Sequence, residues 1–285
     1  MAEERSSIII SVFSTTPGIG KTVTAINLSA GLAKEGYKVC LADLDLQFGD
    51  VLNYLKLSTD NLKSLSDKNI ANAQKVIDVD ADSFQVKDFL ITYRHQDLTF
   101  AVMPPPKYLY DAYQANVATI ENIVKQLTYF DFVVLDLSSA FSALNLAMLD
   151  ISTIINFVGV IDFLPALKNY KIGYDTLIRF NYEESKIRLV ENRADSQKLI
   201  DGKDVERLLG EPFYHRLPND FPSASKSINQ GLPLMFVAPD SRLTNSFWEL
   251  TGKYTNRATN TNLNKVKTAG IGFFSRLLAF LFGKR

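Results

Sequence analysis

The chain has 285 residues, of which 46% are hydrophobic and 22% charged, as in a globular protein that can bury a substantial core. Its 31 basic and 31 acidic residues cancel, so no overall field attracts the chain to nucleic acid. The single cysteine, Cys40, excludes a disulfide framework and a four-cysteine metal site within one chain, and its apolar neighbours predict a buried thiol.

The first residues, MAEERSSIII, are polar and then enter an apolar run, without the pattern of a signal peptide. No stretch of the sequence reaches the roughly 20 consecutive apolar residues that span a bilayer. We therefore expect a cytoplasmic protein.

Short apolar runs alternate with longer helical patterns along the chain. Strands are expected at residues 7–14, 38–45, 98–103, 131–137, 152–160, 186–192 and 212–217. Helices are expected near 21–35, 116–129, 142–149, 164–180, 202–209, 222–230 and 241–255. This alternation predicts an α/β fold, with a doubly wound, mostly parallel sheet and helices on both faces. The polar segment from 57 to 90 has weak periodicity and receives no assignment.

The first strand is followed by STTPGIGKTVTA, residues 14–25, which opens the first helix. Its second half has the composition of a phosphate-binding loop: Gly18, Ile19, Gly20, Lys21 and Thr22. The glycines let backbone N–H groups converge on phosphate oxygens, and the helix N-terminus adds its positive end. Lys21 would neutralise the β- and γ-phosphates, and the Thr22 hydroxyl would ligate Mg²⁺. A glycine-rich turn at a helix start is the alternative, which the strand–loop–helix context disfavours.

Carboxylates end two of the expected strands. Asp136 lies near the end of the run DFVVLDL and is suited to hold a magnesium-bound water, although it could instead cap the next helix. Asp43 and Asp45 lie at the carboxyl end of the second strand, on the same edge of the sheet. Asp45 would orient an attacking water, whereas Asp43 would support the metal site or the turn.

The order of these segments resembles the MinD/ParA family of deviant P-loop ATPases. The resemblance spans residues 7–255 and includes the loop, DLDLQFGDV, FDFVVLDL, LPALKN, ENR with KDVERLLG, and LPND. Within the family, DLDLQFGD and the run from LPALKN to NQGLPL look most like the CpaE/TadZ branch, whose members position pilus assembly machinery. The resemblance does not include the receiver-like N-terminal domain that many members of that branch carry.

The resemblance implies ATP and Mg²⁺ as cofactors and a homodimer that sandwiches two ATP molecules. It implies catalytic roles for Lys21 and Asp45 and a metal site that includes Thr22, Asp43 and Asp136. An adenine pocket is implied at Asn192, Arg193, Pro218 and Asn219. Taken alone, Asn192 is as well explained as a turn residue at a strand end.

The opening of the loop departs from the family pattern K-G-G-x-G-K-T. The first lysine of that pattern, which reaches the partner's phosphates, is replaced by Thr16, and Pro17 and Val23 replace a glycine and a threonine. Loss of this lysine removes one positive charge from the transition state but leaves the local cradle. The sequence therefore predicts firm ATP binding and weak hydrolysis.

The chain closes with a linker and an apolar segment. Residues 256–270 are rich in Asn and Thr, and residues 271–285 form, if helical, one apolar arc with basic residues around it. Its predicted membrane-facing residues are Phe273, Phe274, Leu277, Leu278 and Leu281. Such a helix suits an anionic membrane surface, and MinD-like proteins end in a similar one. The alternative is a closing helix packed on the core.

These observations predict an ATPase domain over residues 1–255, a linker and an amphipathic membrane-binding helix. The expected function is a slowly hydrolysing, dimeric switch that positions a pilus or secretion apparatus at the inner face of the cell membrane. One alternative is a bacterial tyrosine-kinase-like enzyme, because TPGIGKT also resembles that loop, but no tyrosine follows Tyr254. A ParA-like DNA partitioner is the other, and the acidic excess of residues 1–251 disfavours it. An iron–sulfur reductase is excluded, because it would need two cysteines per subunit and the chain has one.

Overall fold

The computed structural model describes residues 7–58, 89–196 and 201–255. The expected linker 256–270 and membrane-binding helix 271–285, with all five of its predicted membrane-facing residues, lie outside the described residues. So does nearly all of the unassigned segment 57–90. In the described part, no helix is both long enough and apolar enough to cross a membrane.

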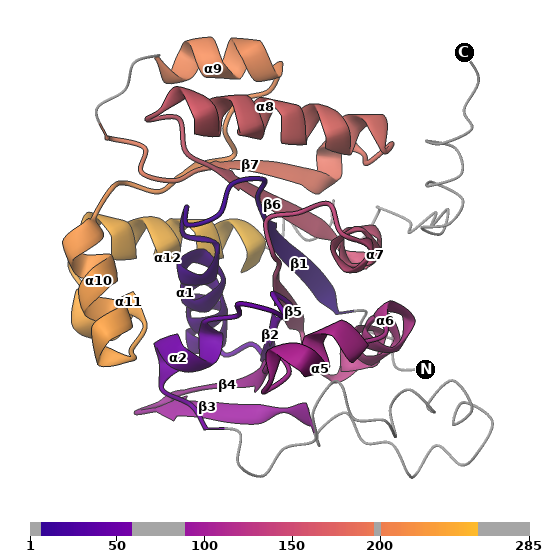
Figure 1. The fold of residues 1–285 in the computed structure, drawn as a ribbon. Helices are drawn as coiled ribbons and strands as arrows, with labels where there is room; N and C mark the ends of the chain where they lie inside the picture. The colour runs from indigo at the N-terminus through magenta and orange to yellow at the C-terminus, as the bar shows by residue number, and fades with distance from the viewer. Residues whose placement is uncertain (1–6, 59–88, 197–200, 256–285) are drawn as a thin grey trace, which may run out of the picture.

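One sheet of eight strands runs through the described part of the chain (Figure 1). Its strands are β1 (Ile8–Phe13), β2 (Val39–Asp43), β3 (Ile91–His95), β4 (Leu98–Met103), β5 (Phe132–Asp136), β6 (Ile154–Gly159), β7 (Ile187–Glu191) and β8 (His215–Arg216). They lie in the order β3-β4-β2-β5-β1-β6-β7-β8, and every neighbouring pair is parallel except the hairpin of β3 and β4. The predicted doubly wound, mostly parallel fold is confirmed.

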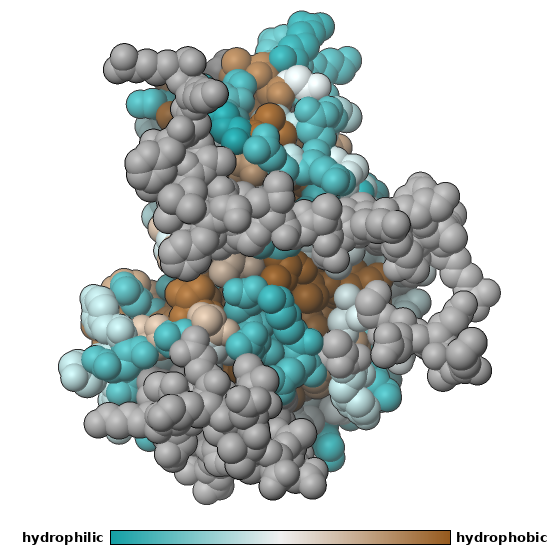
Figure 2. All heavy atoms as spheres, turned by 90° about the vertical axis from the view of Figure 1, so that its right-hand side faces the viewer, coloured by the Kyte–Doolittle hydropathy of each residue, from teal (hydrophilic) through white to brown (hydrophobic). Residues whose placement is uncertain are grey.

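Helices cover both faces of this sheet. They are α1 (Lys21–Lys34), α2 (Val51–Leu55), α5 (Leu109–Gln114), α6 (Val117–Lys125), α7 (Ala143–Ile151), α8 (Leu164–Arg179), α9 (Gly202–Leu209), α10 (Phe221–Gln230), α11 (Leu234–Val237) and α12 (Arg242–Thr255), with single 3-10 turns at Leu127–Tyr129 and Glu184–Lys186. Apolar side chains of α1, α2, α11 and α12 fill the core on one face, and those of α6 to α9 fill the core on the other. Figure 2 shows the side of α6 and α7, where apolar residues are visible between more hydrophilic surfaces.

Burial on both faces explains why the central strands are continuous apolar runs. Every residue of β2, β5 and β6 is buried, including the thiol of Cys40, as predicted. Burial also raises the pKa of this thiol, which keeps it protonated and unreactive. The pattern of these strands is therefore a consequence of the two helical layers.

The strand β1 marks the point where the connections change face. The chain leaves β1 through α1 on one face, whereas β5 connects to β6 through α7 on the other, and β1 lies between β5 and β6. The carboxyl ends of such strands leave a crevice at this point, where α/β proteins bind ligands. The loop after β1 lies at this edge.

The structure also corrects element lengths. The strand expected at 212–217 contains only His215–Arg216, and the helix expected at 116–129 ends at Lys125, with a separate 3-10 turn after it. The strand β3 and the short helices α2, α5 and α11 were not expected from the sequence.

Candidate functional site

The loop between β1 and α1 has the backbone of a phosphate cradle. Gly18 and Gly20 have φ values of 71° and 97°, in the left-handed region that favours glycine. A side chain at Gly20 is also excluded by space, because a Cβ atom there would lie 2.6 Å from Asn192 Nδ2. Gly20 directly precedes the first turn of α1, so the helix N-terminus opens toward this loop.

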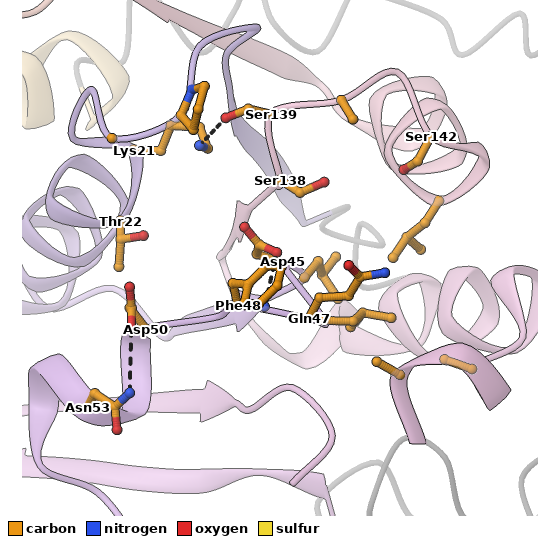
Figure 3. Close-up of a pocket in the computed structure, with 18 of the residues that line it drawn as sticks. Lys21, Thr22, Asp45, Gln47, Phe48, Asp50, Asn53, Ser138, Ser139 and Ser142 are labelled. Atoms are coloured by element: carbon orange, nitrogen blue, oxygen red, sulfur yellow. Dashed lines mark hydrogen bonds between the residues drawn. The ribbon is translucent and has the colours of Figure 1, made fainter. Parts of the chain in front are cut away.

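Lys21, the first residue of α1, places a positive charge beneath the loop. Its side chain is buried, with 9% of the residue exposed, and its Nζ donates a hydrogen bond to Ser139 Oγ at 2.5 Å (Figure 3). Burial lowers the pKa of Lys21, while Asp136 and Asp45 act in the opposite direction. These two carboxylates therefore help to keep the Lys21 ammonium charged although it is buried away from water.

Thr22 and Asp136 meet at the end of β5. The Thr22 hydroxyl donates a hydrogen bond to Asp136 Oδ2 at 2.7 Å. Burial raises the pKa of Asp136 to about 7, opposed by the Thr22 bond and the charge of Lys21. The other carboxylate oxygen, Asp136 Oδ1, is buried and has no hydrogen-bond partner among the described residues. A buried oxygen of this kind attracts a cation or a bound water.

Asp43 lies beside Asp136 on the neighbouring strand, in register with it. Burial, and then the charge of Asp136, raise the pKa of Asp43 well above its usual range. Asp43 Oδ2 accepts a hydrogen bond from the backbone N–H of Val51 at 3.0 Å, and a Cβ atom at Gly49 would lie 2.5 Å from both carboxylate oxygens. Asp43 thus anchors the loop that carries Asp45.

These residues fit a magnesium ion bound together with phosphate. The described residues contain no group of three or more His, Cys, Asp or Glu side chains that could hold a metal by themselves. Mg²⁺ is commonly held by only one or two carboxylates, with water and substrate phosphates as its other ligands. The Thr22 hydroxyl and the unpartnered Asp136 Oδ1 would serve it, with Asp43 behind them. A bound Mg²⁺ would neutralise phosphate charge.

A cavity of about 1010 Å³ opens beside the loop (Figure 3). Its polar lining includes Lys21, Thr22, Asp45, Ser138 and Ser139. Asp45 accepts a long hydrogen bond of 3.4 Å from the N–H of Phe48 through Oδ1. Much of its apolar lining comes from the loop after β2, from α5 and the residue that follows it, and from α6 and α7: Leu44, Leu46, Phe48, Ala112, Ala115, Val117, Ile120, Ala143 and Leu144. The predicted catalytic residues Lys21 and Asp45 therefore share one cavity.

The four predicted adenine-pocket residues lie outside the lining of this cavity. Asn192 Nδ2 donates to the Ile19 carbonyl at 2.6 Å, and Arg193 Nη2 donates to the Gly18 carbonyl at 3.1 Å. Both side chains thus hold the backbone of the phosphate loop through its carbonyl groups. Pro218 and Asn219 follow β8, where the Asn219 N–H donates to Asp195 Oδ1.

The first half of the loop is fastened to α8. Thr15 Oγ1 donates a hydrogen bond to the Asn169 carbonyl at 2.7 Å, and the Thr16 N–H donates to Ser14 Oγ at 3.0 Å. A Cβ atom at Gly173 would lie 2.6 Å from Thr15 Cγ2, so the helix approaches the threonine closely. The altered opening of the loop is therefore an ordered part of the structure.

Sequence reasoning missed two residues of the β5–α7 loop region, Ser139 and Asn145. Ser139 accepts the bond from Lys21, and the buried Asn145 fixes the backbone around Ser139. The run LSSAFS after Asp136 signals a loop rich in small hydroxyl groups. It does not indicate which of them faces the lysine.

Residues 7–159 match the family model described as "AAA domain". The chain is 24% identical to an uncharacterized ATP-binding protein of Methanocaldococcus jannaschii over 98% of both chains, and 27% identical to the septum site-determining protein MinD of Synechocystis over 80% of this chain and 81% of that protein. A second M. jannaschii protein is 30% identical, over 45% of this chain and 49% of that one.

Solved structures share the fold at low sequence identity. A ParA family ATPase of Chlorobium tepidum superposes with a TM-score of 0.74 at 20% identity, over 87% of this chain and 98% of that one. MinD of Pyrococcus horikoshii, solved with Mg-ADP, superposes with a TM-score of 0.73 at 19% identity, over 88% and 97% of the two chains.

Proposed function

The chain belongs to the AAA domain family through residues 7–159 and has the fold of the MinD/ParA ATPases, and from this premise we propose that it is an ATP-dependent positioning switch. The observation that carries the proposal is the junction of α1 and β5. There the Thr22 hydroxyl bonds Asp136, and the buried ammonium of Lys21 lies next to them beneath the glycine cradle. Cradle, lysine and magnesium-side carboxylate are the parts that nucleoside triphosphate binding needs.

We further propose that hydrolysis is slow. Lys21 and Asp45 carry it, with Asp45 orienting the attacking water in the shared cavity. Thr16 occupies the position at which the family pattern has its first lysine. Pro17 fixes the backbone angle φ and removes one N–H donor from the cradle. ATP occupancy, rather than turnover, would then be the signal that the protein gives.

The active form in this proposal is a homodimer with two ATP molecules at its interface, together with protein partners. A related MinD of Aquifex aeolicus has been solved in a MinC:MinD complex, and the MinD of P. horikoshii with Mg-ADP. These relatives support nucleotide binding and association with proteins. The partner machine of this chain would be a pilus or secretion apparatus, on the resemblance of DLDLQFGD and LPALKN–NQGLPL to the CpaE/TadZ branch.

We place the switch in the cytoplasm, at the inner face of the cell membrane. The support is the segment 271–285, in which eight of fifteen residues are Ile, Leu or Phe and none is acidic. Two such segments in one dimer would bind an anionic surface more firmly than one, because the second binds at high effective concentration.

Sedimentation velocity tests the proposed switch. The variant Asp45→Ala, which should bind ATP without hydrolysing it, is expected to sediment as a dimer with Mg-ATP and as a monomer with Mg-ADP. Lys21→Ala should remain a monomer with both nucleotides. The same mass for Asp45→Ala in ATP and in ADP would contradict a nucleotide-controlled dimer.

A further inference from the structure

The hydroxyl of Ser139 is the hydrogen-bond acceptor for the buried lysine of the phosphate loop. Lys21 Nζ donates to Ser139 Oγ at 2.5 Å, and both residues line the cavity (Figure 3). An ammonium group has three N–H donors. The bond to Ser139 therefore leaves two of them for other acceptors that enter the cavity.

The backbone on either side of Ser139 is held by one buried side chain. Asn145, in the first turn of α7, is fully buried. Its Nδ2 lies 3.0 Å from the Ser138 carbonyl, 2.9 Å from Ser138 Oγ and 2.6 Å from the Ala140 carbonyl. The N–H of Asn145 also donates to Ser142 Oγ at 3.2 Å, which caps the helix. These bonds fix the position from which the Ser139 hydroxyl faces Lys21.

We propose that Ser139 is a positioning residue, which holds the Lys21 ammonium in place for the phosphate groups of a bound nucleotide, and that Asn145 sets the place of Ser139. The inference rests on the proposed function, because it requires that Lys21 contacts phosphate. A lysine side chain loses rotamer freedom when it is fixed. A lysine that is already fixed before binding does not lose this freedom again, so the nucleotide binds more tightly.

If Ser139 hindered nucleotide binding, its removal would change the nucleotide affinity in the opposite direction. If Ser139 competed with phosphate for the ammonium, binding would break the hydrogen bond, and removal of the hydroxyl would strengthen nucleotide affinity. If Ser139 positions the lysine, removal of the hydroxyl weakens affinity. The direction of the change therefore distinguishes the two roles.

Calorimetry with a ligand series tests the proposal. Ser139→Ala should weaken the binding of Mg-ATP and of Mg-ADP by about 3- to 10-fold, the effect of losing one ordinary hydrogen bond. The affinity for AMP, measured by competition, should not change, because AMP has no β-phosphate for Lys21 to contact. Ser185→Ala is the control: it removes the hydroxyl of an exposed serine that lies outside the cavity lining.

The isosteric pair Ser139→Thr and Ser139→Val separates the hydroxyl from the shape of the side chain. Threonine should restore affinity to within about twofold and valine should not, with thermal unfolding measured to show that both variants are folded. Unchanged or tighter Mg-ATP binding by Ser139→Ala, or an equal loss of AMP affinity, would overturn the inference. Absence of ATP and ADP binding by the unmodified protein would instead overturn the proposed function, and the inference with it.

Discussion

The side-chain amide of Asn192, the residue directly after β7, donates a hydrogen bond to the backbone carbonyl of Ile19 at 2.6 Å. This bond joins the phosphate loop to a strand 173 positions later in the chain. The N–H of Arg193 donates to Asn192 Oδ1 at 2.9 Å, so the amide is held on both sides. Asn192 therefore supports the loop, in addition to the adenine contact that we predict for it.

Asn192→Ala is expected to weaken the binding of Mg-ATP and of inorganic tripolyphosphate alike, each by about 10-fold, because the loop loses a partly buried hydrogen bond. Calorimetry with both ligands measures this. Tripolyphosphate contains no adenine, so a role in adenine recognition alone would leave its affinity unchanged, and that result would contradict the supporting role.

The double substitution Thr16→Lys with Pro17→Gly should accelerate ATP hydrolysis. It restores a mobile positive charge and a flexible residue at the opening of the loop, where the charge can stabilise the transition state. Phosphate release at saturating ATP measures the rate, with Asp45→Ala as the hydrolysis-dead reference. If the unmodified protein hydrolyses ATP as fast as the double variant, this protein does not need a lysine at position 16 for hydrolysis.

How far the sequence predicts this fold depends on burial. The central strands, such as Phe132–Asp136, are buried on both faces, and their continuous apolar runs made them easy to locate. The edge strand Ile91–His95 is half exposed and follows the polar segment 57–90, so it lacked that signal. The helices Val51–Leu55 and Leu234–Val237 are only one turn long, too short for a helical period to appear.

Some parts of the candidate site could be predicted from short sequence patterns, whereas others depend on contacts between residues far apart in the chain. The loop Gly18–Thr22 and Asp136 are short patterns whose chemistry is contained in the sequence. The bonds of Lys21 to Ser139 and of Asn192 to Ile19 join residues 118 and 173 positions apart. Such contacts depend on how the strands are ordered in the sheet, and no local pattern specifies them.

The buried His215 predicts a loss of stability in acid. Burial, with a further contribution from Lys253, lowers the pKa of His215 to about 4, and its Nε2 lies 2.9 Å from the Ser246 carbonyl. In the unfolded chain the pKa returns to about 6.5, so the unfolded state binds the proton first as the pH falls. This group should therefore remove about 2 kcal/mol of stability between pH 7 and pH 5.

The measurement is the free energy of unfolding of the unmodified protein and of His215→Gln at both pH values. The glutamine variant should lose about 2 kcal/mol less over this range. His95→Gln, which changes the other histidine of the chain, serves as the control. Equal pH dependence in the unmodified protein and in His215→Gln would refute the assignment.

Deletion of residues 270–285 should release the protein from anionic vesicles without unfolding the ATPase domain. The removed segment contains the five predicted membrane-facing residues, and ATP should strengthen vesicle binding of the full chain because a dimer carries two segments. Cosedimentation with vesicles, in ATP and in ADP, measures this. Cosedimentation of the truncated protein, or its insolubility, would favour the alternative of a helix packed on the core.

The central claim is that the loop Gly18–Thr22 binds ATP, and isothermal calorimetry with Mg-ATP tests it most directly. The unmodified protein and Lys168→Ala, which changes an exposed lysine outside the cavity lining, are expected to bind one ATP per chain with equal affinity. Lys21→Ala should show no saturable binding, because the buried charge next to Asp136 is lost. Equal ATP affinity in Lys21→Ala and in the unmodified protein would contradict the account.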